Sequence, residues 1–148
     1  MDPILEFSKN QFFWSAFLAW FLAQTIKVFL GVMREKRFNF KWFADTGGMP
    51  SSHTAAASSL STSVGLMYGF DSAVFTVALV FTLIVMFDAQ TIRLSSGRQA
   101  RLLNKMLDDI YWKKKLDEHK VKEFLGHTPV KVYAGAALGI VVSLLMYK

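Results

Sequence analysis

Residues Phe12 to Met33 read FFWSAFLAWFLAQTIKVFLGVM, a stretch of 22 residues in which Gln24 and Lys27 are the strongly polar members. As an α-helix rising 1.5 Å per residue, this stretch would be about 33 Å long, which is enough to cross the hydrocarbon core of a bilayer. We therefore predict that it spans a membrane.

The composition of the whole chain agrees with a membrane protein. Of its 148 residues, 53% are hydrophobic and 19% are charged, and the mean hydropathy is +0.31. The charged residues gather between long apolar stretches instead of alternating with them, as they would on surface helices of a soluble domain. There is no cysteine, so a disulfide framework and a cysteine-ligated metal site are both excluded.

Two further apolar segments lie in the middle of the chain. Residues Thr54 to Tyr68 are rich in alanine and serine, which suits a helix packed closely against other helices. Residues Ala73 to Phe87 form a continuous apolar run that ends at Asp88, and Gly69 to Ser72 is a turn signal between the two. The pattern predicts a hairpin of two spans.

The last apolar segment, Val132 to Tyr147, is near the lower length limit for a span. Gly135 and Gly139 are four residues apart in it, as on a helix face for close packing. We therefore expect an all-α bundle of about four transmembrane helices that forms a single domain over residues 1–148.

Residues Arg93 to Lys131 are polar and basic, yet apolar residues recur there at roughly helical spacing. This favours an amphipathic helix beside the lipid headgroups. The apolar residues are Leu102, Leu103, Met106, Ile110 and Leu116.

Lysine and arginine are concentrated in Arg34–Lys41 and Arg93–Lys131 and are missing from the Gly69–Ser72 turn. The positive-inside rule then places both basic segments in the cytoplasm and both termini outside. We expect an integral protein of a bacterial cytoplasmic membrane. Because the basic residues adjoin spans, anionic headgroups explain the net charge of +6, and we reject nucleic acid as a partner.

Lys27 and Arg34 are the first candidate ligands. An ammonium inside a span is costly, so a functional role is the default interpretation for Lys27, and we expect its ammonium to point into the bundle toward Ser51. Seven residues are close to two helical turns, so both cations project from one helix face and can converge on one anion. The alternative is that Lys27 snorkels and Arg34 marks the membrane boundary.

The segment from Gly47 to His53, GGMPSSH, stands where a helix should begin. Two glycines let the backbone turn, either Ser51 or Ser52 can cap the helix, and the exposed N–H groups there favour an anion. This predicts a phosphate cradle beside an imidazole. The alternative is an ordinary capped turn with an interfacial histidine.

His127 precedes the last span in a similar way, within Gly126-His127-Thr128-Pro129. Pro129 suits the first turn of a helix, with Thr128 as its cap. His53 and His127 thus occupy equivalent positions at one predicted membrane face and can supply a nucleophile and a proton donor. His119 lies in a charged run and is expected to be solvated.

These residues resemble the motifs of the type 2 phosphatidic acid phosphatase superfamily. Lys27 and Arg34 match its lysine-x6-arginine element, Pro50-Ser51-Ser52-His53 looks like its Pro-Ser-Gly-His element, and His127 resembles the histidine of its third element. The closer resemblance is to the divergent branch, which is related distantly to vanadium-dependent haloperoxidases. That branch's signature is seen here in Thr46 to His53, Asp88-Ala89 with Arg93, Gly97 to Ala100 with Leu103-Asn104, and Leu125 to Pro129.

The resemblance implies that His127 attacks phosphorus to form a phosphohistidine and that His53 protonates the leaving lipid alkoxide. Lys27, Arg34 and Ser51, with Ser52 beside it, would hold the phosphoryl oxygens. No cofactor or metal is required.

The chain departs from the superfamily pattern in its third element, where Val121 and Lys131 replace an arginine and an aspartate. Glu35 also replaces a proline, and Ser52 a glycine. We expect Arg93 to substitute for the missing arginine as a phosphate ligand and Asp88 to orient a histidine.

Two functions follow from the resemblance. The first is a metal-independent lipid-phosphate phosphatase acting on phosphatidic acid, phosphatidylglycerol phosphate or a polyprenyl phosphate or diphosphate. The second is a non-catalytic binder or carrier of anionic lipid phosphates on the same scaffold. A haloperoxidase is remote. The small bundle would also gain stability from self-association, so the sequence leaves a homo-oligomer as one of the possible states.

Overall fold

The computed structural model describes residues 2–36, 48–111 and 129–148, and these ranges contain helices and no strand. The helices are α1 (Pro3–Ser8), α2 (Gln11–Glu35), α4 (Ser52–Tyr68), α5 (Ala73–Tyr111) and α6 (Pro129–Met146). Three of them are long and apolar enough to cross a membrane, over Gln11–Glu35, Ala73–Thr91 and Pro129–Met146. The predicted all-α membrane bundle is confirmed.

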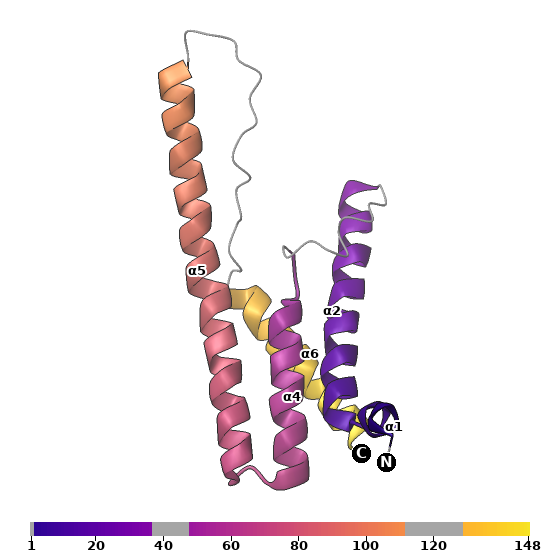
Figure 1. The fold of residues 1–148 in the computed structure, drawn as a ribbon. Helices are drawn as coiled ribbons and strands as arrows, with labels where there is room; N and C mark the ends of the chain where they lie inside the picture. The colour runs from indigo at the N-terminus through magenta and orange to yellow at the C-terminus, as the bar shows by residue number, and fades with distance from the viewer. Residues whose placement is uncertain (1, 37–47, 112–128) are drawn as a thin grey trace.

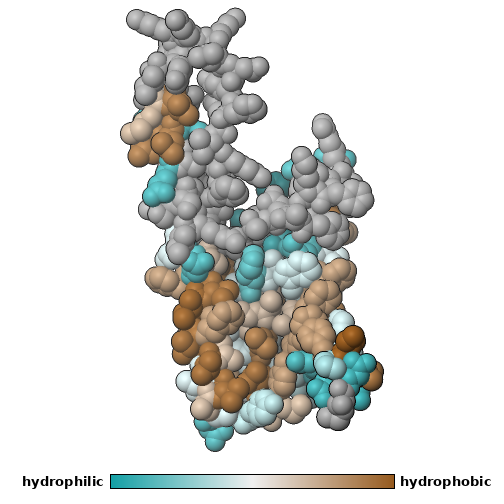
Figure 2. Space-filling view, viewed as in Figure 1, coloured by the Kyte–Doolittle hydropathy of each residue, from teal (hydrophilic) through white to brown (hydrophobic). Residues whose placement is uncertain are grey.

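The helices α2, α4, α5 and α6 run up and down between the two ends of the bundle (Figure 1). The end of α2 and the beginnings of α4 and α6 lie at one end, whereas the α4–α5 turn and both termini lie at the other. Figure 2 shows an apolar band on the sides of the bundle, with hydrophilic residues gathered toward its ends. This is the pattern of a body surrounded by lipid.

The helix α2 has clear start and stop signals. Asn10 caps it, because its side chain accepts a hydrogen bond of 3.0 Å from the backbone N–H of Phe13. The helix ends where Lys36 takes a left-handed conformation, with φ of 53°. Its outward face carries stacked, exposed aromatic rings, including Phe17 and Trp20, which suit contact with lipid.

The helix α4 is the centre of the bundle and contacts α2, α5 and α6. Ten of its 17 residues are buried, and most of these are serine or alanine. With 17 residues, many of them serine, it is not among the helices that are long and apolar enough to cross a membrane. The described part of the chain therefore has three such helices where we counted four from the sequence, and α4 passes between them.

Small residues let α6 lie directly against α4. A Cβ at Gly135 would collide with the carbonyl of Ser51, and one at Gly139 would collide with the carbonyl of Ala55 and stand 2.8 Å from the amide nitrogen of Ser59. The close-packing face predicted from these two glycines is confirmed.

Buried serines connect three helices at the half of the bundle nearer the termini. Ser15 of α2 contacts Ser63 of α4 at 2.6 Å, and Ser63 contacts Ser143 of α6 at 3.0 Å. Ser143 also donates to the carbonyl of Ser59 at 2.6 Å. Because lipid tails are as apolar as leucine, helices in a bilayer associate through such packing and hydrogen bonds.

The predicted α4–α5 hairpin is present, and Gly69 has the positive φ of 91° that its turn requires. Farther along the hairpin, the Thr82 hydroxyl donates to the carbonyl of Ala57 at 2.9 Å. Because the helices are antiparallel, this contact sets which residues of α4 and α5 lie at the same height.

The helix predicted from Arg93 is present as far as Tyr111, where these residues continue α5 without a break. The helix has 39 residues and a length of about 58 Å, roughly twice a bilayer core. No proline interrupts residues 73–111, and a change from apolar to polar side chains does not break backbone hydrogen bonds. The rest of the predicted segment, residues 112–128, lies outside the described residues.

Candidate functional site

The N-terminus of α4 is held by capping and by α6. Ser51 is the N-cap, completely buried, and its hydroxyl accepts hydrogen bonds from the backbone N–H and the hydroxyl of Thr54, at 3.5 and 3.0 Å. The Ser51 N–H donates to the carbonyl of Lys131, in the first turn of α6, at 2.9 Å. The starts of α4 and α6 are therefore joined through their backbones.

Lys27 lies inside the bundle beneath this helix start. Only 7% of the residue is exposed, and its ammonium donates to Ser52 Oγ at 3.0 Å and to Gln24 Oε1 at 2.9 Å. Its side chain points inward, as we expected, although the hydroxyl that it contacts belongs to Ser52 and not to Ser51. The Ser51 hydroxyl is already occupied by its capping role.

Gly48 brings the loop before α4 against the same lysine. Its φ is +100°, a conformation that side chains rarely adopt, and a Cβ placed on it would be 3.4 Å from Lys27 Cγ. The loop backbone thus covers the aliphatic part of Lys27. Pro50, which follows in this loop, is buried.

His53 and Arg34 border this site with exposed side chains. His53 stands in the first turn of α4, directly after Ser52, and Arg34 stands in the last turn of α2. Arg34 is about two helical turns beyond Lys27. The structure therefore brings Lys27, Ser51, Ser52 and His53 together around one helix start, whereas Arg34 stays at the surface above them.

Asp88 and Arg93 both lie on the continuous helix α5. Asp88 is six residues after Thr82, and Ser51 is six residues before Ala57, so the Thr82–Ala57 contact places Asp88 about level with the α4 N-terminus. The Asp88 side chain is exposed, and Ala89 beside it is buried. The side chain of Arg93 and the whole of His127 lie outside the described residues.

Sequence reasoning assigned no role to Gln24 and took Gly48 only as a residue that lets the backbone turn, although both lie against Lys27. The signal for Gln24 was its spacing, because a polar residue three positions before a buried lysine shares its helix face. Residues 2–36, 48–111 and 129–148 contain no group of three or more metal-ligating side chains.

The fold and this site define an integral membrane protein of helical type, with a buried cation held beneath the N-terminus of its central helix. The chain belongs to the Divergent PAP2 family, which it matches over residues 8–142. The resemblance inferred from the motifs is thus confirmed.

A relative in Bacillus subtilis (strain 168), described as the uncharacterized membrane protein YuiD, is 37% identical over 143 residues. The match covers 89% of this chain and 90% of the relative. No solved structure matches the chain.

Proposed function

We propose that this protein is a membrane lipid-phosphate phosphatase that hydrolyses a phosphomonoester through a histidine nucleophile. The observation that carries the proposal is the Lys27 ammonium, buried in the bundle and hydrogen-bonded at 3.0 Å to Ser52, directly before His53. A buried cation, a hydroxyl and the N–H groups of a helix start provide what a phosphate dianion requires. The family name supports the same chemistry.

The joined starts of α4 and α6 support a role for both histidines. The Ser51 N–H contacts the Lys131 carbonyl, and His127 precedes Pro129 by two residues. We propose that this short connection keeps His127 near the beginning of α6, because two peptide units span at most about 7 Å. We propose that both imidazoles reach the phosphate bound there.

The reaction proceeds in two steps. A nitrogen of His127 attacks phosphorus, the bond from phosphorus to the lipid oxygen breaks, and His53 donates a proton to the departing alkoxide. Water, deprotonated by His53, then attacks the phosphorus of the phosphohistidine, the bond from phosphorus to the His127 nitrogen breaks, and phosphate leaves. Lys27, Arg34, Ser52 and Arg93 hold the phosphoryl oxygens, while Ser51, which the sequence also offered as a ligand, caps the helix start, and Asp88 orients a histidine.

We place the reaction at the cytoplasmic face of a bacterial membrane. The ends of α2, α4 and α6 that adjoin the two basic segments lie together in the structure (Figure 1). The positive-inside rule favours the cytoplasm for that end. A reporter enzyme that is active only outside the cytoplasm, fused to the C-terminus, checks this orientation. The fusion should be active, because both termini are expected to lie outside.

A release assay on purified protein tests the catalytic role. Phosphatidic acid, phosphatidylglycerol phosphate and a polyprenyl phosphate or diphosphate are offered in turn, and liberated phosphate is measured. The variant His127→Ala should lose turnover and keep lipid binding, because a nucleophile contributes mainly to bond making. His119→Ala serves as the control, and equal turnover in His127→Ala and the wild type would remove His127 from the mechanism.

A second candidate is a non-catalytic binder or carrier of anionic lipid phosphates. The observation that favours it is Lys131, which stands where the superfamily has a catalytic aspartate and whose backbone carbonyl holds α4. Binding of lipid phosphate without release of phosphate from any member of the panel would support this function.

A further inference from the structure

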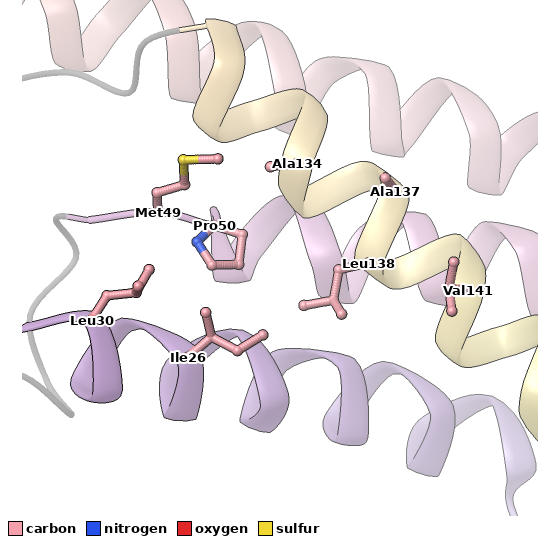
Figure 3. A pocket seen from close by; sticks show the side chains of 8 residues that line it. All are labelled: Ile26, Leu30, Met49, Pro50, Ala134, Ala137, Leu138 and Val141. Carbon is pink, nitrogen blue, oxygen red and sulfur yellow. The ribbon is translucent and has the colours of Figure 1, made fainter. Parts of the chain in front are cut away.

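A groove of about 390 Å³ lies between α2 and α6 (Figure 3). Ile26 and Leu30 form one wall, and residues of α6 that include Ala137 and Val141 form the other. The lining is almost entirely apolar, and the groove is open along one side. Its volume lies within the range of about 300–1,000 Å³ that is common for small-molecule sites.

The groove adjoins the candidate phosphate site. Met49 and Pro50 line its end, and Pro50 is followed at once by the α4 cap, Ser51. On α2, Ile26 lines the groove, while the next residue, Lys27, turns inward to Ser52. One end of the apolar groove therefore lies next to the buried ammonium and the N-terminus of α4.

The position of the groove in the bundle indicates what meets it. Ile26, Leu30 and Val141 are 37%, 46% and 51% exposed, and they belong to the two helices with spanning composition that form the walls. We therefore expect the open side of the groove to face the hydrocarbon of the bilayer. Alanine side chains on α6, such as Ala137, are short enough to leave the hollow between the helices.

We propose that this groove holds a hydrocarbon chain of a lipid whose phosphate is bound by Lys27 and Ser52. The proposal rests on the proposed function. It adds where the hydrocarbon chain of the lipid binds and from which direction the lipid enters. Charge complementarity selects an anionic lipid, because the polar end of the groove adjoins a buried ammonium. A lipid would enter sideways from the bilayer and would not need to leave it.

The hydrocarbon chain of the lipid should not by itself make the groove selective for one lipid over another. Bilayer hydrocarbon is as apolar as the groove, so moving a chain from one to the other gains little from the hydrophobic effect. Enrichment of a lipid in the groove must come from its phosphate. A lipid with the same chains and a blocked phosphate should visit the groove no more often than it visits other lipid-facing surfaces.

Photolabelling of the full-length protein in phosphatidylcholine vesicles tests this. The probes are phosphatidic acid and phosphatidylcholine that carry the same diazirine-bearing acyl chain, and labelled peptides are located by mass spectrometry. Labelling by the phosphatidic acid probe should be concentrated on the segments around Ile26–Leu30 and Ala137–Val141. The phosphatidylcholine probe should label the lipid-facing residues of α5 as strongly as these two segments. The same distribution for both probes would overturn the proposal.

Matched variants separate the groove from the phosphate site. Ala137→Leu fills the groove and should reduce the enrichment to that of the phosphatidylcholine probe. Ala73→Leu makes the same change at an exposed alanine at the far end of α5 and should leave it unchanged. Lys27→Met should lower the enrichment by about tenfold or more, as expected for loss of a charge-assisted hydrogen bond.

The two possible failures give different results. If Ala137→Leu changes the labelling and Lys27→Met does not, the groove binds a chain but the phosphate site is wrong. If Lys27→Met lowers lipid-phosphate binding and Ala137→Leu leaves the labelling unchanged, the groove proposal fails while the phosphate site stands. Native mass spectra could show a dimer of the wild type that is absent from Ala137→Leu. This result would mean that a second copy of the protein occupies the groove, and it would also overturn the proposal.

Discussion

Replacing Lys27 by methionine should weaken lipid-phosphate binding while leaving the fold intact. Methionine keeps most of the side-chain volume in a site where Lys27 is only 7% exposed, and it removes the ammonium that contacts Ser52 and Gln24. A hydrogen bond to a charged group contributes about 1.5–3 kcal/mol. The dissociation constant for phosphatidic acid should therefore rise about 10- to 150-fold.

The effect on stability has two opposing parts. The hydroxyl of Ser52 and the amide oxygen of Gln24 lose a donor, which costs about 1–3 kcal/mol for a buried group left unsatisfied. Removal of a buried ammonium relieves a desolvation penalty of several kcal/mol. We expect the free energy of unfolding to be unchanged or higher, so binding and stability should not fall together.

The assay measures binding of a fluorescent phosphatidic acid and thermal unfolding in the same detergent micelles. Lys105→Met is the matched control, because Lys105 is an exposed lysine on the part of α5 that extends beyond the predicted span. It removes the same charge and should leave the dissociation constant unchanged. If Lys27→Met binds phosphatidic acid with the same dissociation constant as this control, the buried ammonium is structural and does not hold phosphate.

Two other predictions follow from α5 and α6. Arg93→Lys should lower phosphate release tenfold or more, about 1.4 kcal/mol per tenfold, because lysine cannot contact two phosphoryl oxygens in the bidentate manner of arginine; wild-type rates in folded protein would remove Arg93 from the site. Gly139→Ala should cost about 1–3 kcal/mol and lower the melting temperature, because its Cβ would meet the backbone of Ala55. Ile140→Ala, at an exposed position on the same helix, is the control, and an equal loss in both variants would argue against the close α4–α6 contact.

Much of the fold could be predicted because its signals act along the chain. The length of an apolar run decides whether a helix can cross the bilayer, and this located α2, the first part of α5 and α6. The small residues of α4 and the Gly135–Gly139 spacing indicated close packing before any neighbour was known. The inward direction of Lys27 followed from the cost of an ammonium in lipid.

Other features depend on which helix lies opposite which, and these could not be predicted from local patterns. Hydropathy falls after Asp88, but backbone hydrogen bonds carry α5 on to Tyr111, so a boundary between apolar and polar residues was not a helix end. Ser51 and Ser52 were equally good ligands in the sequence. Their different partners arise because one occupies the cap and the other faces α2.

The sequence by itself determined that this protein is an all-helical membrane protein of the Divergent PAP2 family, because the length of apolar runs and a long composite motif are properties of the chain alone. Only the tertiary structure decided that Lys27 donates to Ser52, that Gly48 covers its stem and that a groove opens between α2 and α6 beside them. These contacts depend on distances of a few ångströms between segments far apart in the sequence, which are set by how closely the helices pack.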